Sequence, residues 1–198
     1  IYENFLLKFG PQILKKSISI NIEIEHQPYN FLYDKRLEKS VILGELGEEK
    51  IDKTDELILD LVSKNCRLSL MDIAKKAKLT ANAVKYRMKN LVKRRIIKGY
   101  RTIIDYTKFD LHHYRITLYL SDASKKKEVK AYLDRQKDVV KITKTLGRGD
   151  MRFDILCESL KRVYVLIDDL NHKIPGVIRD FDERVTIQEE IVDYFPNY

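Results

Sequence analysis

Residues 69–93 read SLMDIAKKAKLTANAVKYRMKNLVK, and this stretch decides the fold of the central part of the chain. Ser69 is a typical helix N-cap and Asp72 follows three residues later, which approximates a capping box. Lys78 and Leu79 then form a tight turn, and Thr80 caps the next helix. The stretch therefore predicts two short helices joined by a tight turn.

The second of these helices has one apolar side and one polar side. Val84, Met88 and Leu91 repeat at i, i+4 and i+7, so we expect them to pack inward. The opposite side carries three lysines, an amide and an aromatic ring, namely Asn82, Lys85, Tyr86, Lys89 and Lys93.

The flanking segments complete a known motif. Before the two helices, residues 52–62 predict another helix with Asp52 or Thr54 as N-cap and an inner face of Leu57, Ile58, Leu61 and Val62. After them, residues 96–104, with Lys98-Gly99-Tyr100 in the middle, suit a small β wing. Residues 51–105 are therefore predicted to form a winged helix-turn-helix domain.

The positive charge of the chain is concentrated in this domain. The net charge is +8, from 38 basic and 30 acidic residues. Residues 73–104 hold eleven basic residues and no acidic one, which leaves the rest of the chain slightly negative. A solvated helix face normally mixes both signs, so this block favours a polyanionic partner such as nucleic acid.

Composition excludes several other classes of protein. The 198 residues are 44% hydrophobic and 34% charged, with only 7 glycines and 4 prolines, so the chain is an ordinary globular one. No uncharged run is long enough for a membrane span. The two cysteines, Cys66 and Cys157, lie in different elements, and a reduced, cytoplasmic setting is expected. The first residue is Ile1 and no signal peptide follows it, so the natural beginning is expected to lie upstream.

The last 93 residues, 106–198, have a different periodicity. Strands are expected at 115–120, 139–145, 152–156 and 177–191, and helices at 125–135 and 160–174. The order β-α-β-β-α-β predicts a ferredoxin-like, α+β domain with both helices on one face of an antiparallel sheet.

Residues 1–33 predict a helix over 5–13 and a strand over 17–25, with Ile18, Ile20, Ile22 and Ile24 on one face. At an offset of 167, Ile18, Ile20 and Ile24 match Val185, Ile187 and Ile191, and both strands precede a tail with Tyr, Phe, Pro and Asn. We interpret residues 1–33 as the last helix and strand of an upstream copy of the C-terminal domain. The alternative is an unrelated helix and strand added to the sheet. Residues 34–50 are then a linker.

Four segments of the helix-turn-helix region resemble the leucine-responsive regulator/AsnC (Lrp/AsnC) family of prokaryotic transcription factors. They are Asp52-Lys-Thr-Asp55-Glu-Leu-Ile-Leu, Asn65-Cys-Arg67-Leu-Ser69-Leu-Met-Asp-Ile-Ala74, Leu79-Thr80-Ala-Asn-Ala-Val84-Lys-Tyr-Arg87-Met-Lys-Asn-Leu91 and Arg95-Ile-Ile97-Lys-Gly-Tyr100. The C-terminal segment, with Gly147-Arg-Gly-Asp150, looks like the regulatory (RAM/ACT-like) domain of that family. The resemblance covers residues 51–198 and implies an archaeal tandem-copy member. This chain departs from the family where Arg95 replaces a common glycine and where Arg152 and Asp154 occupy a usually apolar strand.

The resemblance and the basic block together predict a regulator that binds double-stranded DNA. Asn82 can contact adenine and Lys85 can contact guanine in the major groove, and Tyr86 either enters the groove or packs. Arg87 either binds an acid of the first helix or contacts a phosphate. Phosphate donors are expected at Ser69, Lys89, Lys93, Arg94, Lys98 and Arg101.

The loop Gly147, Arg148, Gly149 and Asp150 has two interpretations. Glycines at these positions suit a tight hairpin turn. The resemblance instead implies an effector site, in which Arg148 and Asp150 would pair with the carboxylate and ammonium of an amino acid.

No catalytic constellation, cofactor motif or metal-ligand spacing is recognisable, so an enzyme is not expected. Two alternatives to a DNA-binding regulator stay open: an amino-acid-binding regulatory module of metabolism, and a winged-helix module that binds an acidic protein. One helix-turn-helix unit contacts one half-site, so at least a dimer is expected, paired through sheet edges and strand residues such as Ile116, Leu118 and Leu120. The two copies of a full tandem chain could instead pack as an internal pseudo-dimer.

Overall fold

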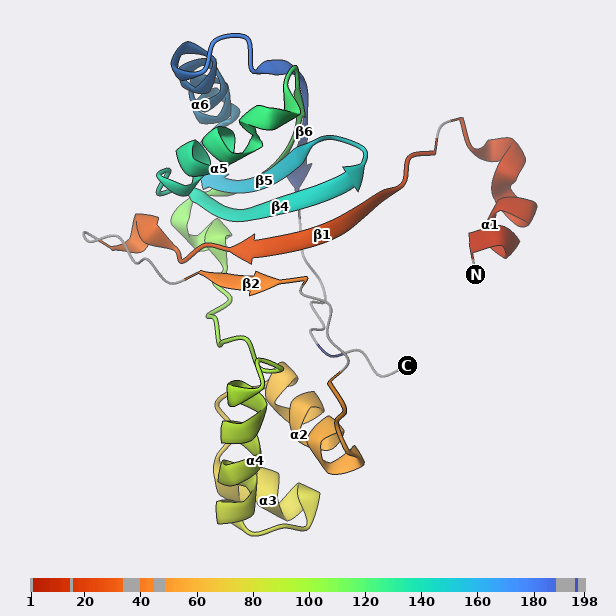
Figure 1. The fold of residues 1–198 in the computed structure, drawn as a ribbon, viewed down its shortest axis with the longest axis vertical. Helices are drawn as coiled ribbons and strands as arrows, with labels where there is room; N and C mark the ends of the chain where they lie inside the picture. The colour runs from red at the N-terminus through yellow and green to blue at the C-terminus, as the bar shows by residue number, and fades with distance from the viewer. Residues whose placement is uncertain (1, 15, 34–39, 45–48, 188–194, 196–198) are drawn as a thin grey trace.

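A computed structural model describes residues 2–14, 16–33, 40–44, 49–187 and 195. Figure 1 shows a helix-turn-helix domain and a sheet domain whose helices cover one face of its sheet. Helix α1 projects away from both, at the end of an extended segment. Phe195, from the C-terminal segment, packs against the core of the helix-turn-helix domain.

The three helices of the helix-turn-helix domain begin where the sequence provides caps. They are α2 (Lys53–Lys64), α3 (Leu70–Ala77) and α4 (Ala81–Lys93), capped by Asp52, Ser69 and Thr80. Ile58, Ile73, Val84 and Leu91 are at most 1% exposed and form the core. The prediction for Leu57 is wrong: it is exposed, and Leu59 is buried in its place, because the buried side of α2 is formed by Asp55, Ile58, Leu59 and Val62.

The predicted β wing is also wrong, since residues 96–104 contain no β-strand. A two-residue hairpin turn needs positive φ angles, and Gly99 does not have one. The segment instead runs as an extended connector past strand β2 (Val41–Leu43), where a Cβ on Gly99 would lie 3.0 Å from Val41. Residues 96–104 therefore contact the sheet domain and do not form the predicted β-hairpin.

The sheet domain confirms the predicted β-α-β-β-α-β order. Its elements are β3 (His112–Leu120), α5 (Lys126–Asp134), β4 (Val139–Gly147), β5 (Met151–Cys157), α6 (Leu160–Lys173) and β6 (Ile178–Thr186). The strands lie in the order β4-β5-β3-β6, all antiparallel, as in ferredoxin-like folds. Residues 188–191 of the predicted last strand lie outside the described residues, as does most of the tail used in the repeat comparison.

Ile116, Leu118 and Leu120 do not offer a pairing surface, contrary to our expectation. They are at most 5% exposed, in the core between the sheet and its helices, which also includes Phe153 and Leu166. Strand β3 lies inside the sheet, between β5 and β6, so its edges are paired as well. Any pairing between copies must use other residues.

The N-terminal segment extends this sheet. Helix α1 (Tyr2–Phe9) is followed by β1 (Ser19–His26), which pairs with β4, and β2 pairs with β1 within the predicted linker. A bulge between Asn21 and Glu23 places Ile20 opposite Leu146 and Ile24 opposite Thr143. Leu146 and Thr143 are on different faces of β4, so the isoleucines of β1 do not share one face as predicted.

Candidate nucleic-acid interface

The turn between α3 and α4 is fixed by local hydrogen bonds. The Ser69 hydroxyl accepts a hydrogen bond from the Asp72 amide at 3.1 Å and donates one to the Asp72 carboxylate at 2.7 Å. Lys78 ends α3 in the left-handed conformation, with φ 54°, and the Thr80 hydroxyl accepts from the Ala83 amide at 3.2 Å. This geometry confirms the predicted caps and leaves the Ser69 side chain bound to Asp72.

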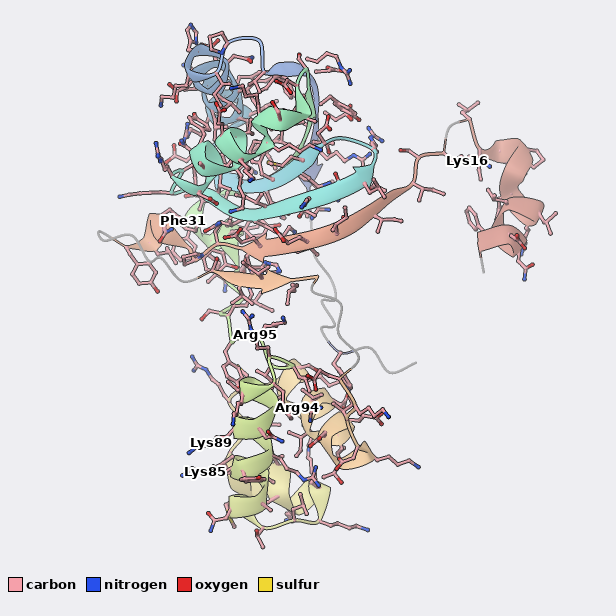
Figure 2. The ribbon with its side chains drawn as sticks, in the orientation of Figure 1. Lys16, Phe31, Lys85, Lys89, Arg94 and Arg95 are labelled. Atoms are coloured by element: carbon pink, nitrogen blue, oxygen red, sulfur yellow. The ribbon has the colours of Figure 1, made fainter. Side chains whose placement is uncertain are left out.

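The core holds the inner side of α4, so its opposite side faces solvent. Val84 and Leu91 are buried, and Met88 is partly buried against the same core. The outer face of α4 consists of five exposed residues, Asn82, Lys85, Tyr86, Lys89 and Lys93. Figure 2 shows Lys85 and Lys89 projecting away from α2 and α3.

Tyr86, for which groove contact and packing were both open, is 72% exposed and does not pack into the core. The lysines of this face have no carboxylate partner among the described residues. Amide, phenol and ammonium groups can all donate hydrogen bonds to base edges or phosphates. The outer face of α4 therefore presents hydrogen-bond donors along the length of the helix, from Asn82 to Lys93.

Arg87 lies at the border of this face and binds α2 and its cap. Its Nη1 is 2.7 Å from Asp52 and 2.8 Å from Asp55, which confirms the structural alternative considered for this residue. The pKa of Asp52 is lowered, first by the hydrogen bond from the Asp55 amide and then by that from Arg87. Arg87 thus joins the N-terminus of α2 to α4.

Two other arginines of the basic block also bind within the chain. Arg94 binds Glu49, with an Nη2 to carboxylate distance of 2.8 Å, and also the backbone oxygen of Lys50. Arg101 contacts His26 Nδ1 and donates a hydrogen bond to the Tyr29 hydroxyl at 2.7 Å. The partners of Arg94 therefore lie in the segment before α2, and those of Arg101 lie at and just after the end of β1, away from the outer face of α4.

The Arg101 contact affects a titratable group. Burial, together with the charges of Arg101 and Lys141, lowers the pKa of His26 to about 4. Sequence reasoning missed His26, since nothing along the chain indicated that it would meet a residue 75 positions away. This contact ties the connector to β1.

The Gly147–Asp150 loop is the turn of the β4-β5 hairpin. Gly147 and Gly149 have φ angles of 103° and 76°, and a Cβ on Gly149 would lie 2.2 Å from Thr117. Arg148 is 2.7 Å from Asp182, and Asp150 accepts from the Leu120 amide at 3.0 Å and lies 3.1 Å from Lys126. The hairpin interpretation is confirmed, and the two charged side chains assigned to an effector have partners in the chain.

Within the part of the chain that the structure describes, no group of three His, Cys, Asp or Glu residues could hold a metal ion. Across the same residues, no helix has the length and apolar character that crossing a membrane requires.

Comparisons with known proteins agree with this geometry. Residues 51–98 match the family model described as winged helix-turn-helix DNA-binding. An uncharacterized HTH-type transcriptional regulator of Pyrococcus abyssi is 46% identical over 55 residues, 28% of this chain and 36% of that protein. The match thus spans about a third of that relative's length. One from Pyrococcus furiosus is 26% identical over 148 residues, 72% of this chain and 99% of that protein.

Solved structures extend the likeness to both domains. Escherichia coli AsnC aligns with a TM-score of 0.62 at 20% identity, over 73% of this chain and 97% of that one. A Neisseria meningitidis regulator in complex with L-Met aligns with a TM-score of 0.65 at 16% identity, over 75% and 97%. The predicted fold class and the resemblance to the Lrp/AsnC family are confirmed. These relatives are transcriptional regulators and not enzymes, and the Pyrococcus proteins fit the archaeal origin that the resemblance implies.

Proposed function

We propose that this chain is a sequence-specific regulator that binds double-stranded DNA through α4. The observation that carries the proposal is the outer face of α4, where three lysines, Asn82 and Tyr86 are exposed above a packed core. An α-helix fits the major groove of B-DNA, and the N-terminal residues of a recognition helix meet the base edges.

The proposed contacts follow from position along α4. Asn82 and Lys85, in its first half, would read adenine and guanine, and Tyr86 lies beside them. Lys89 and Lys93, in the second half, would bind phosphates. Lys98, in the connector, already has an interaction within the chain and is not among the proposed contacts. Ser69, Arg94 and Arg101 are left out of the proposed contacts, because each already binds groups of the chain.

A single helix-turn-helix unit recognises one half-site, so we propose that the regulator acts as a dimer or larger assembly. Two recognition helices would then lie about 34 Å apart, one turn of DNA. We also keep the proposal that residues 1–33 derive from an upstream copy of the sheet domain; α1 precedes β1 as α6 precedes β6, which supports it.

We also propose that the sheet domain binds an amino-acid effector. The Neisseria meningitidis protein was solved with L-Met, which supports the idea for this fold. In this chain, however, Arg148 and Asp150 would have to exchange Asp182 and Lys126 for the ligand.

Fluorescence anisotropy with duplex DNA at 50 and 200 mM salt tests the main proposal. Six or more phosphate contacts lower affinity by roughly 10³-fold over that range. Lys85→Ala/Lys89→Ala should bind less well than the parent. The control Lys137→Ala/Lys161→Ala removes two exposed lysines of the sheet domain and should bind as the parent does.

The same experiment separates the alternatives. Absence of binding at low salt, or equal binding by the α4 variant, would contradict the DNA-binding function and favour an amino-acid-binding module. If a labelled acidic protein bound the basic face and excess duplex DNA failed to displace it, the protein-interaction alternative would replace the proposal.

A further inference from the structure

The connector, residues 96–104, joins the helix-turn-helix domain to the sheet domain (Figure 1). Two domains that share a small interface usually move relative to each other, and an extended segment without contacts of its own would permit that motion. This connector instead contacts the sheet domain and the N-terminal segment along its length and just beyond its end. These contacts determine how firmly the helix-turn-helix domain is held.

Arg101 makes the most specific of these contacts. Its Nη1 contacts His26 Nδ1, and its Nη2 donates a hydrogen bond of 2.7 Å to the Tyr29 hydroxyl. The guanidinium also lies 5.6 Å from the centre of the Tyr29 ring, within the range of a cation–π interaction. All three side chains are partly buried. A planar guanidinium with two partners fixes a direction as well as a distance, so the connector cannot turn freely at this point.

The partners of Arg101 are themselves tied to the sheet domain. His26 is the last residue of β1 and is paired with Lys141 of β4. The next residue, Gln27, continues this attachment: its backbone amide donates to the Val140 carbonyl, and its side chain donates to Asp134 of α5, each at 3.0 Å. Arg101 is therefore bound to a part of the chain that is fixed on the sheet.

Two further contacts hold the connector on either side of Arg101. The backbone at Gly99 passes so close to β2 that a Cβ there would lie 3.0 Å from the Val41 side chain. Just after the connector, the Tyr106 ring packs edge-on against the His113 ring of β3, with the ring centres 5.7 Å apart. The connector is thus attached to β2, β1 and β3 in turn, which is more than a single hinge contact.

We propose that Arg101 is a positioning residue: by binding His26 and Tyr29 it holds the connector on the sheet and fixes the orientation of the helix-turn-helix domain relative to the sheet domain. Its consequence for DNA rests on the proposed function. If each copy holds α4 at a fixed angle, an assembly of two copies accepts half-sites at one helical phase and rejects others. Arg101 would thereby set the half-site spacing without contacting DNA.

Distances between two spin labels, measured by double electron–electron resonance, test the fixed orientation without DNA. The labels are placed at Lys75→Cys on α3 and Lys161→Cys on α6, both exposed positions. Cys66 is replaced by serine, and Cys157 is buried. Dilution with unlabelled protein leaves the distances within one chain. The parent should give one narrow distance distribution, and Arg101→Gln should lose it and give a broad one.

Arg135→Gln is the matched control, because Arg135 is exposed at the end of α5 and the chemical change is identical. It should keep the narrow distribution. Tyr29→Phe removes the hydroxyl that accepts from Arg101 and keeps the ring. It should also broaden the distribution, and it provides a second test should Arg101→Gln fail to fold.

Fluorescence anisotropy tests the consequence for DNA. The probes are a duplex that the parent selects from a randomised pool, and the same duplex with five added base pairs at its centre, about half a turn of B-DNA. The parent should bind the lengthened duplex about tenfold more weakly or worse, because one half-site loses its contacts. Arg101→Gln should reduce this ratio severalfold, whereas its affinity for a duplex with one half-site should equal that of the parent.

Two results would overturn the proposal. One is a broad distance distribution in the parent. The other is an equally narrow distribution in both Arg101→Gln and Tyr29→Phe. Neither result depends on DNA, so a parent that bound no duplex would contradict the proposed function alone. Equal binding of the two duplexes by a parent with a narrow distribution would overturn the role of Arg101 in half-site spacing.

Discussion

The two domains use their positive charges in different ways. Within residues 73–104 of the helix-turn-helix domain, six exposed lysines have no carboxylate partner among the described residues: Lys75, Lys76, Lys78, Lys85, Lys89 and Lys93. In the sheet domain, many of the described cations bind an acid, as Lys130 binds Glu25 and Arg162 binds Asp138. The first pattern suits a polyanionic partner outside the chain, and the second suits internal stability.

A second difference lies within the basic block itself. Arg87, Arg94 and Arg101 bind groups of the chain, whereas the six lysines point to solvent. A guanidinium is planar and presents several donors at once, so it can join two segments, whereas an ammonium is a mobile point charge. A basic run must therefore be divided by residue type before it is assigned to a ligand.

The largest effect on stability is expected from removing a buried carboxylate that binds cations of its own domain. In Asp154→Asn, Arg115 and Lys141 lose the buried carboxylate that they bind, and the free energy of unfolding of the sheet domain should fall by about 3 to 5 kcal/mol. Urea unfolding at pH 7 measures this. Asp180→Asn, at an exposed position of β6, should change it by less than about 0.5 kcal/mol. A small loss in Asp154→Asn would mean that this domain does not depend on its internal ion pairs.

The contact between the domains gives the next effect, through pH. Folded His26 stays neutral down to about pH 4, whereas an unfolded histidine gains a proton near pH 6.5. The unfolded state therefore binds more protons between these values, and stability is lost as the pH falls through that window.

Between pH 7 and pH 5, this contribution should lower the free energy of unfolding by about 1 to 2 kcal/mol, allowing for partial exposure. His26→Gln keeps an acceptor for Arg101 and should lose that part of the pH dependence. Urea unfolding of both proteins at the two pH values provides the comparison. Parallel pH profiles would show that His26 is not held neutral by the fold.

The smallest effect concerns the turn of the helix-turn-helix domain. Lys78 adopts φ 54° with an exposed side chain, and glycine tolerates this conformation better. Lys78→Gly should stabilise this domain by roughly 0.5 to 1 kcal/mol. Lys76→Gly, inside α3, should instead destabilise it by about 1 kcal/mol. Thermal unfolding distinguishes them, and a loss in both variants would exclude strain at Lys78.

Much of the fold could be predicted from local signals. Caps at Asp52, Ser69 and Thr80, and the alternation of β3 and β5, depend on neighbours along the chain, and they gave the helices and the strand order. The same holds for the outer face of α4, because the spacing of Val84, Met88 and Leu91 fixes which side is buried.

The remaining features depend on contacts between distant residues. The connector replaces a β wing because Arg101 meets His26 and Tyr29, about 70 positions away in the chain. The bulge in β1 turns Ile20 and Ile24 to different faces of the sheet, and no local sequence pattern predicts this bulge. The partners of Arg94 and Arg148, likewise, could not be inferred from a run of charges.

The most direct test of the account is the salt dependence of duplex DNA binding by Lys89→Ala/Lys93→Ala, with Arg94→Gln as the comparison. Each phosphate contact contributes about 0.9 to the slope of log affinity against log salt. We predict that the slope falls by about 1.8 for each half-site bound in the double lysine variant and stays unchanged in Arg94→Gln. An unchanged slope in the lysine variant, or an equal fall in Arg94→Gln, would contradict the division of the basic block into external lysines and internal arginines.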